Sequence, residues 1–400
     1  MKRLIFQVLL GTAAVLACAT LAMKGGEKAS ARKHSKFKVI HVTPHGIAPT
    51  AENLALVSHL SVLGATIPLW NYSVVAYDGA TYSGTIVGRN PFFHGHRTTT
   101  IPTYLVPVKF TFADTNEVFD PTAADPCISN STVDSLVLAS PIFKTSDFVM
   151  NGVDVGTAQY LDAFERASFW SEVGGTPYHT VFTATPTVLP AVSVTVPTLN
   201  GSTFNKSIFG GCRDMGKMDI AWWENYLQTT ILPSLAGQGV GPTNFPQFVF
   251  DSVAMTISDQ CCALGYHNAF INGSGNLQTY SANDFDTSLA FGGIDIGAMS
   301  HEVAEWMDDP VGTNPTPAWG AEGQVPSGSC QSNLEVGDPL SSPPTNPFSV
   351  LLSGHTYTLQ ELAFYSWFYG LVPSQGAGGK YSDNGTFTGT AIACPPGGSN

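Results

Sequence analysis

The segment from Gly292 to Pro310, GGIDIGAMSHEVAEWMDDP, constrains the fold more than any other part of the 400-residue chain. Asp295 is placed to cap a helix, because its carboxylate can accept backbone N–H groups of the first turn. Pro310 disfavours the αR conformation of the residue before it, so a helix over residues 295–308 is expected. Its apolar residues recur at helical spacing and would share one face: Ile296, Met299, Val303, Trp306 and Met307.

Polar residues would fill the opposite face of this helix. His301 and Glu305 are four residues apart and therefore share that face, with Glu302 at its flank. Asp308 and Asp309 follow at the negative end of the helix dipole, where each anion is unfavourable by about 0.3–1 kcal/mol. A nearby cation would compensate them, so the helix is a candidate wall of a metal site. The alternative is an ordinary solvated acidic face.

The N-terminal residues carry the pattern of an exported protein. Residues 1–22 combine a basic start with an apolar core, which predicts a secretory signal peptide, and residues 23–38 are expected to be a flexible basic leader. Cys18, in VLAC, imperfectly matches a lipoprotein cleavage site, so a lipid anchor there is a minor alternative. No later run reaches the roughly 18–20 apolar residues of a membrane span. We therefore expect a secreted protein without a transmembrane segment.

Charge is distributed unevenly along the chain. Eight of the 17 Lys and Arg residues, but only one of the 30 Asp and Glu residues, precede residue 39. The remainder has nine basic and 29 acidic residues, a formal net charge of −20. Such a surface repels nucleic acid, because binding a phosphate backbone requires clustered Lys and Arg. Nucleic acid is therefore not an expected partner.

Six cysteines follow Cys18, an even number that permits up to three disulfides in an exported chain. No CxxC pair occurs, which disfavours a cysteine-ligated zinc site. Because Cys261 and Cys262 are adjacent, we expect them to bond to different partners more easily than to each other. The six residues are Cys127, Cys212, Cys261, Cys262, Cys330 and Cys394.

An α+β fold is expected, with a β-rich half at residues 39–200. The segments 82–87, 101–112 and 181–196 are rich in Thr, Val, Tyr and Phe between Pro and Gly residues, which predicts strands. One amphipathic segment, residues 157–173, predicts a helix.

The second half, residues 201–400, alternates helical and strand patterns. A helix is expected at residues 214–235, and strands at 248–257 and 277–280. A Pro-, Gly- and Ser-rich loop should follow the helix at 295–308 and run to about residue 357. Thr358 and Glu361 form a capping-box pattern for a last helix.

The sequence HEVAE at residues 301–305 suits metal binding, because side chains four residues apart on a helix can grip one ion. It resembles the HExxH signature of zincin metallopeptidases, in which two histidines bind zinc and the glutamate between them is the general base. The resemblance implies His301 as a metal ligand and Glu302 as the catalytic base. Glu305 stands in place of the second histidine, and residues 201–400 would form a zincin-like α+β domain.

A third ligand would come from the segment LEVGDPL at residues 334–340. By analogy with zincins that take a glutamate from beyond the helix, Glu335 is the first choice. Asp338 or Asp309 could replace it or support a ligand. Two carboxylates and one imidazole would cancel the charge of a divalent ion, which weakens its pull on bound water.

A wider pattern accompanies this motif. SHEVAEWMDDP, then Trp319, then LEVGDPL is similar to uncharacterised secreted bacterial proteins with an S/T-HExxE…DP…ExGD pattern, and distantly to the exordium-like family of plants. The resemblance covers roughly residues 250–370.

Other candidates are weaker. His267, in LGYHNAF, is expected to be structural, with a place near the cleft as the alternative. His94 and His96 are expected to be surface histidines. No GxSxG elbow and no GxxxxGK(S/T) loop occurs, so serine-hydrolase and nucleotide-binding functions lack support.

These observations favour a secreted metal-dependent hydrolase of zincin type that acts on protein or peptide substrates, a metalloendopeptidase if it is active. The expected cofactor is a divalent metal, zinc in the first place and calcium in the second. The main alternative is a non-catalytic secreted or cell-envelope binding protein with a structural metal site. A polysaccharide-cleaving enzyme with two acids is a further alternative. The sequence does not indicate an oligomeric state.

Overall fold

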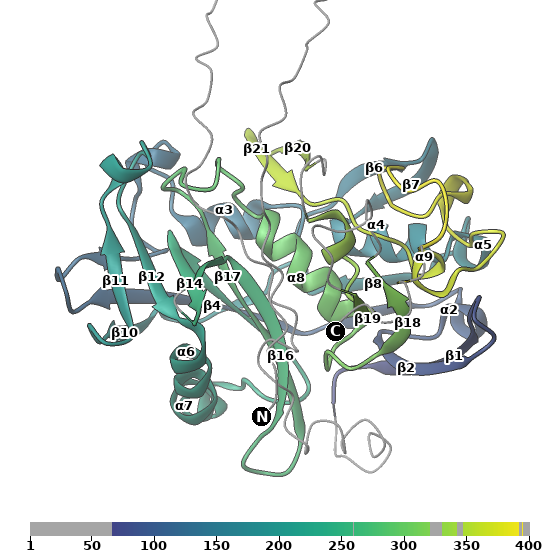
Figure 1. Cartoon of the computed structure of the whole chain (residues 1–400), viewed down its shortest axis with the longest axis horizontal. Coiled ribbons are helices and arrows are strands. Elements are labelled where there is room, and N and C mark those ends of the chain that lie inside the picture. Colours follow the sequence, from purple (N-terminus) through teal and green to yellow (C-terminus); the bar gives the residue numbers. More distant parts are fainter. Residues whose placement is uncertain (1–65, 259, 321–329, 342–346, 392–393, 395–400) are drawn as a thin grey trace, which may run out of the picture.

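The computed structural model describes residues 66–258, 260–320, 330–341, 347–391 and residue 394 (Figure 1). The predicted signal peptide, the neighbouring lipid-anchor cysteine and the basic leader lie outside these residues. Helices and strands are mixed along the described chain, which confirms the α+β class. Among the described residues, no helix combines the length and the apolar character that a membrane crossing requires.

A mixed sheet lies at the centre of the molecule (Figure 1). Four of its five main strands run parallel to one another, and the fifth, at one edge, is antiparallel to its neighbour. The main strands in spatial order are β10 (Val192–Val196), β4 (Thr103–Phe112), β13 (Phe245–Asp251), β17 (Leu277–Phe285) and β16 (Gly265–Ile271). Short strands β5 (Val118–Phe119) and β9 (Thr187–Val188) also pair with β4. Strands from both sides of residue 200 therefore share one hydrogen-bonded layer.

Alternating residues of β13 serve the two faces of this sheet. Phe245 and Val249 belong to the core that contains α8 (Gly297–Asp308), whereas Phe248 belongs to the core that contains α6 (Ile220–Tyr226). Helix α8 packs along β16 and β17. Both faces of the sheet are thus covered, which explains why β13 and β17 are buried along their whole length.

A second sheet lies beside the first. It contains β11 (Gly201–Phe204), β12 (Met215–Asp219), β14 (Val253–Ile257) and β15 (Gln260–Ala263). The prediction of one strand at residues 248–257 is therefore wrong, because β13 and β14 belong to different sheets. Ser252 between them has a φ of 54°, which interrupts the extended backbone. The predicted strand at 277–280 is confirmed within β17.

The helix predicted at residues 214–235 begins later than expected. Its first residues form β12, and the carboxylate of Asp219 then caps α6 by accepting the Trp222 N–H at 2.7 Å. The helical run continues through a π-helical turn at Leu227–Ile231 and α7 (Leu232–Leu235). The prediction is confirmed over residues 220–235 and wrong before them.

Small two-stranded sheets accompany the N-terminal half. They are β1 (Leu69–Val75) with β2 (Thr81–Val87), β3 (Thr98–Ile101) with β8 (His179–Phe182), and β6 (Ser146–Met150) with β7 (Val153–Ala158). The strands predicted at residues 82–87 and 101–112 are confirmed as β2 and as the end of β3 with β4. The segment 181–196 is divided among β8, β9 and β10.

Helices in this half are short. The helix predicted at residues 157–173 is divided into α4 and α5. The remaining helical segments are single turns or little more. In chain order the helices of this half are α2 (Pro91–His94), η2 (Pro126–Ile128), α3 (Val133–Ala139), α4 (Tyr160–Ser168) and α5 (Trp170–Val173). The second half adds the single turns η3 (Lys206–Ile208), η5 (Ala236–Gln238), η6 (Asp338–Leu340) and η7 (Ala377–Gly379).

Two small sheets occupy the C-terminal segment for which a loop was predicted. They pair β18 (Pro315–Trp319) with β19 (Gln331–Asn333), and β20 (Phe348–Leu352) with β21 (His355–Leu359). Thr358 lies in β21, so the predicted capping box is wrong. Glu361 instead accepts hydrogen bonds from Ser382 and Thr386, and the last helix, α9, spans Tyr365–Tyr369.

Three cysteine pairs lie at disulfide distance, which is compatible with an extracellular protein. The pairs are Cys127–Cys212, Cys261–Cys262 and Cys330–Cys394. The expectation that Cys261 and Cys262 bond to different partners is therefore wrong, because the other four cysteines already pair with one another across the chain.

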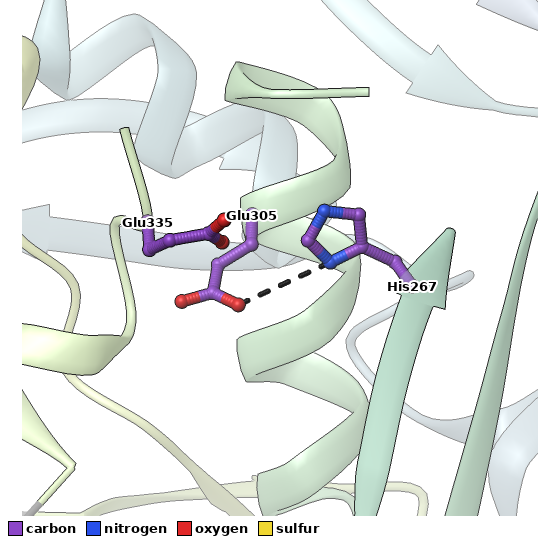
Figure 2. A group of neighbouring side chains, drawn as sticks. All are labelled: His267, Glu305 and Glu335. Atoms are coloured by element: carbon purple, nitrogen blue, oxygen red, sulfur yellow. Dashed lines mark ion pairs between the residues drawn. The ribbon is translucent and has the colours of Figure 1, made fainter. Parts of the chain in front are cut away.

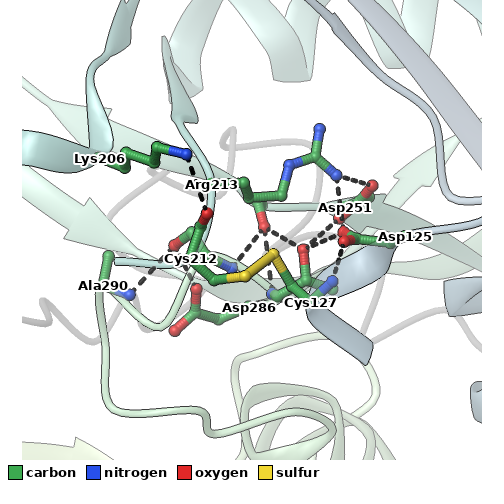
Figure 3. The surroundings of a disulfide bond; sticks show 11 residues. Asp125, Cys127, Lys206, Cys212, Arg213, Asp251, Asp286 and Ala290 are labelled. Carbon is green, nitrogen blue, oxygen red and sulfur yellow. Dashed lines mark hydrogen bonds and ion pairs between the residues drawn. A yellow bond between two sulfur atoms is a disulfide. The ribbon is translucent and has the colours of Figure 1, made fainter. Parts of the chain in front are cut away.

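The disulfide between Cys127 and Cys212 joins the N-terminal half to the loop that precedes β12 (Figure 3). Arg213, the next residue, pairs with Asp125 at 2.8 Å and with Asp251, the last residue of β13, at 2.7 Å. Both carboxylates are nearly fully buried. A covalent link and two buried ion pairs therefore hold this junction, and removing either partner of such a pair would leave an uncompensated charge.

Replacement of Trp306 tests the packing of α8 on the sheet. Its ring stacks on Phe245 with centroids 3.6 Å apart and is fully buried. We expect Trp306→Ala to lower the free energy of unfolding by about 3–5 kcal/mol, because it leaves a large cavity. Urea unfolding would measure this loss. Leu199→Ala, at a side chain that is 98% exposed, is the control and should change stability by less than about 0.5 kcal/mol. Equal unfolding midpoints for both variants would contradict the packing role.

Candidate metal centre

Helix α8 is buried on every side rather than on one face. Eleven of its twelve residues are buried, including His301, Glu302 and Glu305. The alternative of an ordinary solvated acidic face is therefore wrong, because β21 and residues 330–341 cover that face. The polar side chains face other parts of the protein, so their charges need compensation from within.

Asp295 does not cap α8 as predicted. Ile296 occupies the N-cap position, and no side chain bonds to the first turn there. The Asp295 carboxylate instead accepts the backbone N–H of Thr358 at 2.7 Å and lies 2.9 Å from Nε2 of His355. Asp295 thus ties the start of the helix to β21.

His301 and Glu305 meet on α8 as their four-residue spacing predicts. The distance from His301 Nε2 to Glu305 Oε1 is 3.0 Å. The other ring nitrogen, Nδ1, donates to Oε1 of Gln360 at 3.0 Å, and the Gln360 amide in turn donates to the carbonyl of Gly337 at 2.6 Å. This chain fixes the imidazole with its Nε2 lone pair toward Glu305, as in histidines that bind metals.

The segment after β19 positions the Glu305 carboxylate. The backbone N–H groups of Gly337 and Asp338 both donate to Glu305 Oε1 at 3.2 Å. Gly337 also lies against the His301 ring, where a Cβ atom would come within 2.5 Å of Nδ1. Only glycine permits this approach, which brings Asp338 Oδ1 to 3.6 Å from His301 Nε2.

Glu335 and Asp338, the predicted third ligand and its alternative, both reach the cluster. Asp338 Oδ2 accepts a hydrogen bond from Gln331 at 2.7 Å, and Glu335 Oε1 accepts one from Asn333 at 2.5 Å. Within the described residues, the second oxygen of each carboxylate has no hydrogen-bond partner. Asp338 is the acid near His301, whereas Glu335 groups with Glu305.

His267, which we expected to be structural, lies inside the cluster. It comes from β16, and its Nδ1 is 3.3 Å from Glu302 Oε2 and 4.0 Å from Glu305 Oε2. Figure 2 shows its ring and the carboxylates of Glu305 and Glu335 converging. Potential ligand atoms of these three residues lie within 4.8 Å of one another, as do those of His301, Glu302 and Glu305.

His267 was expected to be structural because its partners in the cluster are distant in the chain. A strand that packs against the metal-candidate helix can bring a histidine to it. Whether the strand of His267 does so depends on the pairing of β16 with β17, which the sequence does not show. Gln360 and Gln331 were missed for the same reason.

Asp309, the other predicted alternative, turns away from the cluster. Its carboxylate accepts the N–H groups of Thr313 at 2.9 Å and Asn314 at 2.8 Å. Its carbonyl oxygen lies 3.2 Å from His267 Nε2. Asp309 therefore orients a histidine through its backbone.

Burial raises the pKa of every carboxyl in the cluster, because water no longer solvates the charged form. The pKa of Glu302 rises to about 8. Burial, with neighbouring carboxyls, raises the pKa values of Glu305 and Glu335 well above the ordinary range, and burial also raises that of Asp338. Burial lowers the pKa of His267 to about 3. Without a cation nearby, burial therefore favours the protonated form of these carboxyls.

The donor atoms suit a divalent ion. In a tetrahedral site with bonds of about 2.0–2.2 Å, donors lie about 3.3–3.6 Å apart. His301 Nε2 is within a few tenths of an ångström of that spacing from Glu305 Oε1 and from Asp338 Oδ1. No Lys or Arg of the described chain forms an ion pair with a carboxylate of the cluster. The described residues thus supply no fixed positive charge there.

A cavity of about 140 Å³ borders the cluster on one side. His301 and Glu302 contribute to its wall, whereas Glu305 and Glu335 lie behind them. Most of its other lining is apolar and includes Leu264, Ile294, Ala298, Leu340 and Leu359. A small molecule or a side chain in this cavity would therefore meet His301 and Glu302 first.

Comparison with protein families, with curated proteins and with solved structures gives no match to this chain.

The raised pKa of Glu302 predicts how the free energy of unfolding depends on pH. Because the pKa of Glu302 is raised from 4.5 to about 8, the folded protein binds more protons than the unfolded chain between these values. Its stability without metal should therefore fall as pH rises from about 5 to 8. Urea unfolding in a chelator at several pH values would measure this, and Glu302→Gln should reduce the slope. A midpoint that rises with pH over this range would contradict the assignment.

Proposed function

We propose that the chain is a secreted metal-dependent hydrolase, of the zincin type, that cleaves peptide bonds. The observation that carries the proposal is the position of His301 and Glu302 at the wall of a cavity, with Glu305 3.0 Å behind the imidazole. Metal-assisted hydrolysis requires at least two side chains that bind the ion and a carboxylate that faces the same cavity.

Each residue then has a distinct role. His301 and Glu305 hold the ion, and Asp338 or Glu335 completes its ligands. The ion would polarise a scissile carbonyl and lower the pKa of a water molecule. Glu302, whose Oε1 is 3.9 Å from His301 Nε2, would take a proton from that water and pass it to the leaving amine.

The ligand types favour zinc over calcium. Calcium is bound by oxygen ligands, six to eight of them, whereas zinc readily combines imidazole nitrogen with carboxylate oxygen. His301 and His267 both present ring nitrogens to the carboxylates. A proteinaceous substrate with an apolar side chain would suit the apolar cavity beside them.

A second candidate function is a non-catalytic binding protein with a structural ion. The burial of Glu305 and Glu335 behind the cavity favours it, because closed sites serve structure more often than catalysis. Elemental analysis of the protein purified without added metal separates the two functions. At least one equivalent of zinc supports the hydrolase, calcium supports the rival, and protein without any bound metal would contradict both.

Replacement of the proposed base tests the mechanism. We expect Glu302→Gln to lower kcat for peptide hydrolysis by at least about 100-fold, since a positioned base contributes roughly 10²–10⁴-fold. Bound zinc should remain, because Glu302 is not among the proposed ligands. A fluorogenic peptide assay with parallel metal analysis would measure both. Glu224→Gln, a buried glutamate on the other face of the sheet, is the matched control. Unchanged turnover would remove Glu302 from the mechanism.

A further inference from the structure

Glu305 faces two histidines with its two carboxylate oxygens. Oε1 lies 3.0 Å from His301 Nε2, and Oε2 lies 4.0 Å from His267 Nδ1. The two groups of potential metal ligands found in the described chain overlap only at this residue. One group contains His301 and Glu302, and the other contains His267 and Glu335. A carboxylate with separate partners on its two oxygens has the geometry of a bridge between two ions.

The Nδ1 atom of His267 faces carboxylate oxygens of Glu302 and Glu305. Its Nε2 lies 3.2 Å from the carbonyl oxygen of Asp309, which can only accept, so Nε2 carries the hydrogen. In the neutral ring, Nδ1 then presents a lone pair toward Glu302 Oε2 at 3.3 Å and toward Glu305 Oε2. Two lone pairs facing each other repel unless a cation or a proton lies between them. A backbone carbonyl on the opposite nitrogen is also the usual support of a metal-binding histidine.

Glu305 and Glu335 point unsatisfied oxygens into the same space. Both residues are fully buried. Oε2 of each has no hydrogen-bond donor among the described residues, although Oε1 of Glu305 has two donors and Oε1 of Glu335 has one. A buried carboxylate oxygen without a partner is costly, and costlier still beside a second one. Figure 2 shows both carboxylates on the side of the His267 ring that carries Nδ1.

The charge of the cluster exceeds what one ion can compensate. Four carboxylates, those of Glu302, Glu305, Glu335 and Asp338, surround two imidazoles, and no Lys or Arg of the described chain pairs with them. One divalent ion would leave two negative charges buried. Two divalent ions would balance all four.

We infer that the centre holds two divalent ions that share the Glu305 carboxylate. The first lies at His301 and Glu305, with Asp338 beside it. The second lies at His267, Glu305 and Glu335. This inference rests on the proposed metal site and extends it, since two ions about 3.5–4 Å apart can act together on one reacting group. The competing arrangement is a single ion, with a proton shared between Glu305 and Glu335.

Metal stoichiometry of the full chain tests the inference without any activity assay. The protein would be stripped with a chelator, equilibrated with buffered Zn²⁺ and measured by mass spectrometry of its metals. Two equivalents are expected, with two anomalous peaks about 4 Å apart in zinc-edge diffraction from crystals. One equivalent and one peak would overturn the second ion and leave the proposed function standing. No bound zinc would overturn both.

Single substitutions locate each ion. His267→Ala and Glu335→Gln should each lower the zinc content from two equivalents to one, whereas Glu305→Gln should lower it below one, because both ions depend on Glu305. His355→Ala and Glu224→Gln, which change the same residue types outside the cluster, should retain two. Two equivalents in folded His267→Ala would overturn the inference. If a variant fails to fold by circular dichroism, the wild-type stoichiometry and the anomalous peaks decide the question.

Discussion

Repulsion among buried carboxylates is the constraint on which the arrangement of this protein depends. Four acidic side chains lie around two histidines in the interior, and the described chain offers them no basic partner. Several other buried acids have basic or hydrogen-bonding partners. Arg213 neutralises Asp125 and Asp251, and Glu224 receives hydrogen bonds from tyrosine and amide donors. At α8 the described chain gathers acids around two histidines and leaves one oxygen each of Glu305, Glu335 and Asp338 without a hydrogen-bond partner, which is a cost that a bound cation would remove.

The scaffold explains how such a cluster can be held in place. Helix α8 packs along β16 and β17 of the central sheet through Val303, Trp306 and its other apolar residues, so the positions of His301 and Glu305 follow from a rigid contact. Strand β16 adds His267 from the sheet, and residues 330–341 close over the helix with backbone donors. Three elements far apart in sequence therefore each supply a fixed part of the candidate centre, and every side chain that could bind a metal there is buried.

Local patterns predicted part of this arrangement. The apolar spacing and Pro310 were sufficient to define α8, and the four-residue spacing was sufficient to place His301 beside Glu305. The downstream acids could be named because they follow closely in a turn-rich segment. Asp295 was assigned wrongly, because a carboxylate before a helix can cap it or bond elsewhere, and β21 offered it other donors. The burial of the polar face also escaped prediction, since the elements that cover it are more than twenty residues away.

His267 shows the limit of reading a sequence locally. Nothing in LGYHNAF distinguishes a structural histidine from a ligand, because the difference lies in which strand becomes the neighbour of α8. The same holds for Gly337, whose missing side chain matters only because the His301 ring lies against it. Long-range pairing, rather than residue type, decides both cases.

The disulfide between Cys330 and Cys394 affects the conditions under which the acidic cluster assembles. It fixes the start of the segment that carries Glu335 and Asp338 to a residue 64 positions further along the chain. Under reducing conditions this loop closure is lost, and bringing two acids against α8 costs more conformational entropy. Oxidation of this cysteine pair therefore favours assembly of the acidic cluster, and a thiol-rich compartment would disfavour it.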